Sequence, residues 1–206
     1  MTLISGELQY ELTERARVHY PNVLPYHNWD HAKDVMASAK TIASRSVHPE
    51  IRKNGPLLVI AAAWHDADYF KADTPAFETK EKRSADLAFN SLPELNRKER
   101  LLIASAIDDT TVAKTEKDSV FGEALHLADL GYFAADHPTF INRLSRMRLE
   151  WGNPSWDETV ERTKAFGGHV ILEAQKVLRE IYIEKDADAW IAAINKNLAS
   201  LEETTS

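Results

Sequence analysis

The chain has 206 residues, 44% hydrophobic and 28% charged, which is enough apolar material for one buried core and excludes intrinsic disorder. Its 25 basic and 32 acidic residues give a net charge of -7, which argues against long nucleic acids because these bind basic surfaces. The absence of cysteine excludes disulfides, a thiolate nucleophile and a cysteine zinc site, so a metal site would use His, Asp and Glu.

Apolar residues recur with the helical period of about 3.6 along most of the chain. The first such stripe runs from Ala32 to Ile42 and follows Asn28, a residue type that begins helices. Pro56 then precedes an apolar run ending at Trp64, whose alanines favour a central, buried helix over a strand. Further helical patterns cover residues 80–90, 96–107, 120–134 and 138–149.

The C-terminal part of the chain is also predicted to be helical. Its longest pattern covers 156–181, where Gly167 and Gly168 could bend the helix, and the last pattern covers 190–201. The polar residues 202–206 are expected to fray. No stretch alternates between apolar and polar residues as a strand does, and no segment has the composition of a linker. We therefore predict one all-α domain spanning 1–206.

The N-terminal residues contain no basic stretch followed by an apolar core, so we expect no secretory signal peptide. The longest apolar run, 57–64, is far shorter than the roughly 20 residues that cross a bilayer as a helix. We therefore expect a cytoplasmic protein without a membrane partner.

Two histidines lie at the start of the first predicted helix. His27 and His31 are four residues apart and face nearly the same way if the helix has begun, which suits a divalent transition metal. The alternative is an N-terminal capping turn with ordinary surface histidines.

Two acidic positions also lie in apolar surroundings. His65 and Asp66 end the apolar run, and a carboxylate that leaves water needs a cation or strong donors. Alternatively, that helix reaches the surface at Asp66. Asp129 interrupts an apolar helical stripe from 125 to 133, where it is either a ligand or an internally hydrogen-bonded acid.

Together, these residues follow the order His…His-Asp…Asp on three predicted helices. This order resembles the HD-domain metal-dependent phosphohydrolases, a helical superfamily named for the adjacent His-Asp pair. The sequences at 26–31, 62–69, 81–85 and 128–131 are similar to its predicted-phosphohydrolase branch. The resemblance covers about residues 10–185 and implies a single-domain helical HD-domain-like bundle, with the C-terminal helix continuing to about residue 201.

The resemblance also implies roles for individual residues. His31, His65, Asp66 and Asp129 would hold one divalent ion, which could be zinc, manganese, cobalt, iron, nickel or magnesium. His27 matches the first histidine of a His-Asn-x-x-His motif and would protonate the leaving group. Asp66, beside the ion, would also orient the nucleophile.

Other positions either extend or depart from the family pattern. Glu81 and Ser84 match a Glu-x-x-Ser element near the site in relatives, which makes Glu81 a candidate substrate-binding residue. Leu24 stands where many relatives have arginine. Lys114 stands where many have the histidine of a Thr-x-x-His motif, which favours a mononuclear centre. Lys114 could instead contact a phosphate, and its alternative role is that of a solvated loop residue.

The resemblance predicts metal-dependent hydrolysis of a phosphoester in a small phosphorylated metabolite, with a nucleotide as the best candidate. Leu24 and Lys114 keep open a second interpretation, a nucleotide-binding or regulatory module that does not turn over its ligand. A purely structural helical interaction protein is a third interpretation, but it leaves the ordered His and Asp set unexplained.

Overall fold

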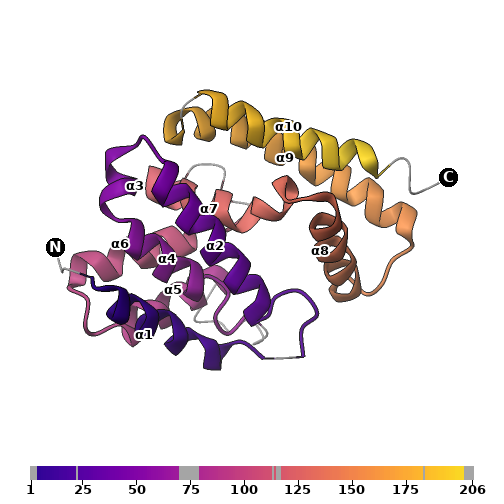
Figure 1. Ribbon diagram of the computed structural model, residues 1–206. Coiled ribbons are helices and arrows are strands. Elements are labelled where there is room, and N and C mark those ends of the chain that lie inside the picture. The colour runs from indigo at the N-terminus through magenta and orange to yellow at the C-terminus, as the bar shows by residue number, and fades with distance from the viewer. Residues whose placement is uncertain are drawn as a thin grey trace. The chain divides into compact units, whose positions relative to one another are not determined.

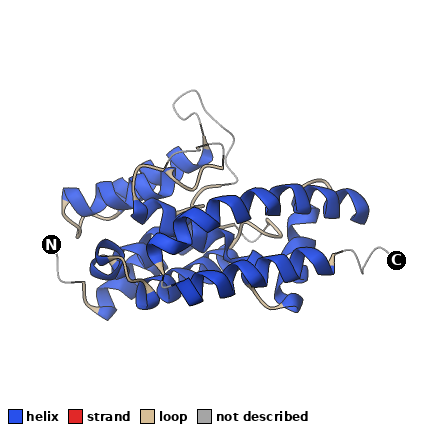
Figure 2. Ribbon diagram, turned by 90° about the horizontal axis from the view of Figure 1, so that it is seen from above, coloured by secondary structure: helices blue, strands red, loops and turns tan. Residues whose placement is uncertain are grey.

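The computed structural model describes residues 4–21, 23–69, 79–112, 114, 117–182 and 184–201. All regular secondary structure in these ranges is helical, which confirms the predicted all-α class (Figures 1 and 2). The chain separates into two compact units, Met1–Asp129 and Leu130–Ser206. A single functional domain over the whole chain stays a prediction. In the described parts of the chain, no helix has both the length and the apolar character needed to span a bilayer.

The first unit is built around one buried helix, α4. Its elements are α1 (Gly6–Ala16), the short 3-10 helix η1 (Arg17–His19), α2 (Trp29–Arg45), α3 (Pro49–Lys53), α4 (Gly55–Trp64), α5 (Lys80–Ser91), α6 (Arg97–Asp108) and α7 (Val120–Asp129). Helix α4 packs against α1, α2, α3, α5, α6 and α7. A helix that is apolar on every side can be covered only by neighbours on every side, as predicted for this run.

Polar side chains fix where several helices of the first unit begin. The Asn28 side chain accepts hydrogen bonds from the backbone at the start of α2, and Thr79 does the same for α5. At α6, Asn96 and Glu99 form a reciprocal capping box. Such caps satisfy backbone N–H groups that have no partner inside the helix, so they define the first residue of each helix.

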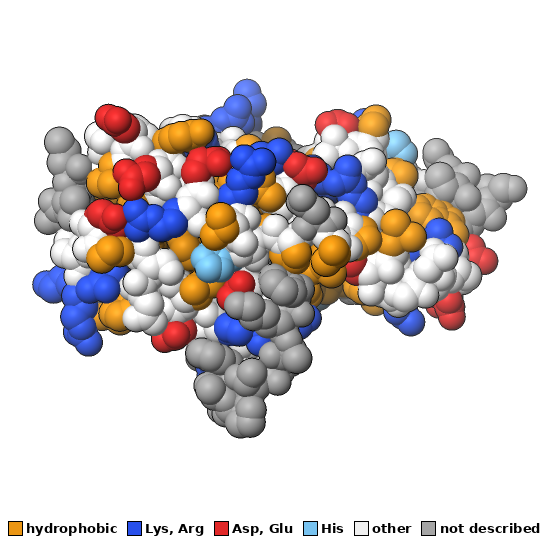
Figure 3. Space-filling model, turned by 90° about the horizontal axis from the view of Figure 1, so that it is seen from below, with side chains coloured by type: hydrophobic (Ala, Val, Ile, Leu, Met, Phe, Trp, Pro, Cys, Tyr) orange, Lys and Arg blue, Asp and Glu red, His pale blue; other side chains and the backbone are white. Residues whose placement is uncertain are grey.

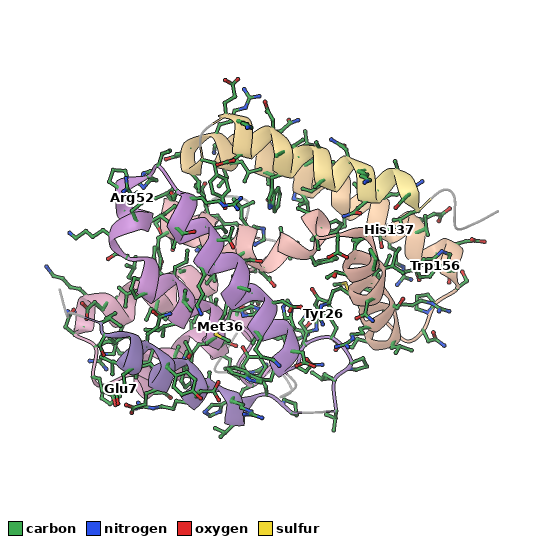
Figure 4. The ribbon with its side chains drawn as sticks, in the orientation of Figure 1. Glu7, Tyr26, Met36, Arg52, His137 and Trp156 are labelled. Carbon is green, nitrogen blue, oxygen red and sulfur yellow. The ribbon has the colours of Figure 1, made fainter. Side chains whose placement is uncertain are left out.

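The second unit contains η2 (Leu130–Ala134), α8 (His137–Glu150), α9 (Trp156–Ile181) and α10 (Glu184–Ser200). Helices α9 and α10 lie side by side (Figures 1 and 2). His137 and Trp156, at the starts of α8 and α9, are labelled in Figure 4. The buried core of the unit includes Leu130, Phe133, Phe140, Leu144, Val160, Val170, Ile194 and Leu201.

Three differences from the sequence predictions have physical reasons. Helices α1 and α3 were not predicted, because α1 buries only Leu12, Thr13 and Ala16 and α3 has five residues. The pattern at 120–134 is not one helix, since the α-helix ends at Asp129 and continues as 3-10 turns. The two glycines at 167–168 do not interrupt α9, which is continuous.

A buried asparagine ties α10 to η2 in the second unit. The Asn197 Nδ2 donates hydrogen bonds to the carbonyl oxygens of Phe133 (2.9 Å) and Ala135 (2.8 Å). Both carbonyls lie at the end of η2, where no helical N–H reaches them. The side chain therefore takes the place of missing backbone donors.

We expect Asn197→Ala to lower the free energy of unfolding by about 2 kcal/mol, because the buried Phe133 carbonyl and the part-buried Ala135 carbonyl lose their donor. Asn195→Ala is the matched control, since Asn195 is exposed on the same helix and its change should stay within about 0.5 kcal/mol. Urea denaturation followed by circular dichroism measures both. Equal losses in the two variants would contradict the tethering role.

Candidate metal centre

Four side chains predicted to be metal ligands meet in the first unit. His31 comes from the first turn of α2, His65 and Asp66 follow the end of α4, and Asp129 is the last residue of α7. The two Nε2 atoms of His31 and His65 are 3.2 Å apart. His31 Nε2 lies 3.0 Å from Asp129 Oδ1, and His65 Nε2 lies 3.0 Å from Asp66 Oδ2.

The remaining cross-distances close the cluster. His31 Nε2 lies 3.4 Å from Asp66 Oδ2, and His65 Nε2 lies 3.4 Å from Asp129 Oδ1. His31, His65 and Asp66 form a buried group whose ligand atoms all lie within 4.8 Å of one another, close enough to share one ion. The Asp129 side chain is 24% exposed, against 10% or less for the other three, so it is the least buried of the four.

The start of α2 places His31. The Asn28 Oδ1 accepts hydrogen bonds from the N–H groups of Asp30 (2.9 Å) and His31 (3.3 Å). Its Nδ2 donates to the carbonyls of Leu24 and Pro25, which holds the incoming loop against the helix start. Tyr26, labelled in Figure 4, lies in this loop. The centroid of its ring is 4.5 Å from that of the His31 ring.

A backbone contact fixes the tautomer of His65. Its Nδ1 lies 2.8 Å from the carbonyl oxygen of Ala62, which can only accept a hydrogen bond. The proton of the neutral imidazole therefore resides on Nδ1, and the lone pair of Nε2 points into the centre. Metal-binding histidines commonly use this arrangement, in which the nitrogen that does not bind metal donates to a carbonyl.

Burial and mutual charge determine the protonation of the four groups. Burial lowers the pKa of both imidazoles, but the carboxylates of Asp66 and Asp129 outweigh this effect. The pKa of His31 is therefore above the usual value, and that of His65 is well above it. Burial raises the pKa of both carboxyl groups, but the charge of His65 and hydrogen bonds from His31 and His65 lower it below the usual range. The centre thus stabilises positive charge beside its carboxylates.

The donor set fits a divalent ion. Two neutral imidazoles and two carboxylates supply a charge of minus two, which a divalent ion balances. Mixed nitrogen and oxygen ligands are suited to several first-row metals. The buried position of His31 and His65 and the fixed tautomer of His65 hold two nitrogen donors toward one point before any ion binds.

A tyrosine that the sequence analysis did not identify holds Asp66. The buried Tyr20 hydroxyl donates to the carbonyl of Ala63 (2.9 Å) and accepts from the N–H of Asp66 (3.2 Å). Helix α4 has just ended there, so these backbone groups lack helical partners. No local pattern marks Tyr20, because its partners lie more than forty residues further along the chain.

Two further contacts hold the turn at residues 65–69. The Asp68 N–H donates to the carbonyl of His19 (3.1 Å), and Asp68 has a left-handed backbone with φ 63°. A non-glycine residue rarely adopts this conformation without support from its surroundings. The Ser84 Oγ donates to the carbonyl of Ala67 (2.7 Å), so the predicted Glu-x-x-Ser element contacts the turn through its serine.

The other predicted site residues have different positions. His27 is half-buried, and its ring lies 5.7 Å from the His31 ring in an edge-on arrangement. Glu81 lies in the first turn of α5, and its side chain makes no hydrogen bond or ion pair among the described residues. The substrate-binding role assigned to Glu81 stays a prediction.

Lys114 is bound by carboxylates. Its Nζ lies 2.6 Å from Asp109, 3.0 Å from Asp118 and 3.1 Å from Asp108. Burial lowers the pKa of Lys114, but hydrogen bonds to these three acids outweigh it and raise the value above the ordinary one. A phosphate would have to compete with three carboxylates for this ammonium group, and its role in substrate binding stays a prediction.

The comparisons with known proteins identify the fold. No protein-family model and no curated protein matches the chain. The phosphodiesterase domain of Salpingoeca rosetta rhodopsin phosphodiesterase, a crystal structure, matches with a TM-score of 0.70 and 17% sequence identity, over 98% of this chain and 81% of that one. The chain shares the all-α fold of that domain. This confirms the helical architecture that the sequence resemblance implied, and at this identity the likeness concerns the fold alone.

We expect Tyr20→Phe to weaken the binding of a divalent ion by about 10–100-fold, because partners that orient a ligand typically contribute this much. Tyr10→Phe is the matched control, since Tyr10 is 68% exposed on α1. Isothermal titration of the metal-free protein with Mn²⁺ or Zn²⁺ measures both. Unchanged affinity in Tyr20→Phe would show that the hydroxyl does not position Asp66.

We also expect metal affinity to rise with pH. An ion must displace protons from His31 and His65, and the raised pKa of both imidazoles extends this competition above the ordinary value of about 6.5. The gain should be up to about tenfold per pH unit for each displaced proton. Competition against a chromogenic chelator at several pH values measures it, and an affinity independent of pH would exclude these histidines as ligands.

Proposed function

We propose that the chain is a metal-dependent phosphohydrolase that acts on a phosphoester of a small phosphorylated metabolite, with a nucleotide as the substrate. The observation that carries this proposal is the convergence of two imidazoles and two carboxylates from α2, the end of α4 and the end of α7. The named structural neighbour is a phosphodiesterase domain, and its likeness in fold supports phosphoester chemistry.

The residues that would hold the ion are His31, His65, Asp66 and Asp129. A divalent ion held there supplies Lewis acidity, which polarises a phosphoryl oxygen and makes water a competent nucleophile near neutral pH. Asp129, the least buried of the four, is where a phosphate group would approach the ion.

Two side chains would act on protons and water. Asp66, with Oδ2 directed toward both histidines, would orient the attacking water. His27, half-buried and edge-on to the His31 ring, would donate a proton to the departing alkoxide. General-acid catalysis of this kind contributes about 10²–10⁴-fold.

The charge of the protein favours a small substrate. The net charge of -7 repels a long polyanion, whereas a single phosphate at a divalent ion needs no basic surface. On the face drawn in Figure 3, basic and acidic side chains of the described residues lie interspersed. This distribution supports a nucleotide over DNA or RNA.

A second candidate is a nucleotide-binding or regulatory module that binds without turnover. One observation favours it: Lys114, the cation that stands where relatives have a histidine, is bound by three carboxylates. The two candidates share the metal centre and differ only in turnover, so a single set of measurements separates them.

The test uses untagged protein, its metal content and a nucleotide panel assayed with several divalent ions. We expect about one ion per chain and hydrolysis that a chelator abolishes and added metal restores. His65→Ala should lose both ion and turnover, since a three-ligand remnant cannot hold the geometry. His169→Ala, an exposed histidine on α9, is the matched control.

The outcomes separate the candidates. Bound metal without turnover of any nucleotide would favour the binding module. A His65→Ala variant with full metal content would contradict the centre itself.

A further inference from the structure

The ring of Tyr69 contacts an imidazole ring and an ammonium group. Its centroid is 3.8 Å from the His27 ring, with 12° between the planes, and the Lys80 Nζ lies 4.0 Å from the same centroid. The Tyr69 ring therefore contacts the His27 imidazole by stacking and the Lys80 ammonium group by a cation–π interaction.

Other contacts restrict the His27 ring further. Tyr26 meets it nearly perpendicularly at 4.9 Å, and His31 meets it edge-on at 5.7 Å. Aromatic rings prefer such offset-stacked or edge-to-face arrangements. Of the three, Tyr69 is the ring that stacks parallel to the imidazole (12° between the planes), so it favours one plane for the two ring nitrogens.

The stack is anchored to the turn that carries the candidate ligands. The Tyr69 N–H donates to the carbonyl of Asp66 (3.0 Å). The Nζ of Lys80, the first residue of α5, also lies over the Tyr69 ring, whose electron-rich face attracts a cation. The orientation of His27 is thereby coupled to the position of the Asp66 backbone.

We propose that Tyr69, capped by Lys80, is a positioning residue that holds the His27 imidazole in the orientation required for proton donation. The catalytic part of this inference rests on the proposed function. The orientation of the His27 ring does not, because it can be measured in the metal-free protein. Proton transfer is sensitive to geometry, since a displacement of about 1 Å can cost about 10²-fold in rate.

The orientation is tested first by NMR of histidine side chains in the metal-free protein, with His27→Ala assigning the signals. Stacking on Tyr69 should shift the carbon-bound ring protons of His27 upfield. Tyr69→Phe should keep this shift, and Tyr69→Leu should abolish it. Tyr132→Leu, which removes an aromatic ring in the second unit, should leave it unchanged. Unchanged His27 signals in a folded Tyr69→Leu variant would overturn the proposal.

The catalytic consequence is tested with two monoesters, AMP and p-nitrophenyl phosphate. Tyr69→Leu should keep its metal and lose about 10²-fold in kcat on AMP, whose alkoxide needs a proton. The loss on p-nitrophenyl phosphate should be much smaller. The Tyr69→Phe variant, which keeps the aromatic ring, should hydrolyse both esters at wild-type rates. His27→Ala should show the same contrast at greater size.

Failure of this proposal is distinguishable from failure of the proposed function. Equal losses on both esters would mean that Tyr69 supports substrate binding or the fold, which overturns the positioning role. If the wild-type protein turns over neither ester with any metal, the proposed function fails on these substrates. The NMR result then decides by itself whether Tyr69 orients His27.

Discussion

Two carboxylates held partly away from water beside two imidazoles impose the main constraint on this protein. Asp66 and Asp129 cannot remain ionised there without positive charge close by, because removing a charge from water is expensive. The two carboxylates raise the pKa of His31 and of His65, which favours positive charge on the imidazole pair in the metal-free protein. A divalent ion would supply that charge with more compact geometry. The surrounding helices bring four ionisable groups to one point, and the charge balance makes that arrangement stable.

The candidate ligands lie at helix ends rather than in helix interiors. His31 is in the first turn of α2, His65 is the residue after α4, and Asp129 closes α7. Helix ends leave backbone groups that need external partners, and Asn28 and Tyr20 supply them here. The same hydrogen bonds that complete the helices therefore orient the side chains of the centre.

The central helix and the order of the site residues could be predicted from the sequence for different reasons. The run ending at Trp64 is apolar on every side, and only a surrounded helix accommodates it. The order of His31, His65, Asp66 and Asp129 along the chain and its resemblance to a family group them as one site, since each alone has a structural explanation that is at least as good. The role of Tyr20 could not be predicted, because its hydroxyl bonds to backbone groups that only tertiary packing brings near. The same holds for Lys114, whose carboxylate partners converge through the fold.

The candidate ligands extend from near the beginning of the first unit to its last residue, Asp129. An ion bound to all four would therefore act as a cross-link, closing a loop that contains most of the unit. Because the four ligands converge only when the unit is folded, the binding free energy of the ion would add to the free energy of unfolding, in a protein that has no cysteine for a disulfide. In that arrangement, the ion that supplies the chemistry would also stabilise the fold of the first unit.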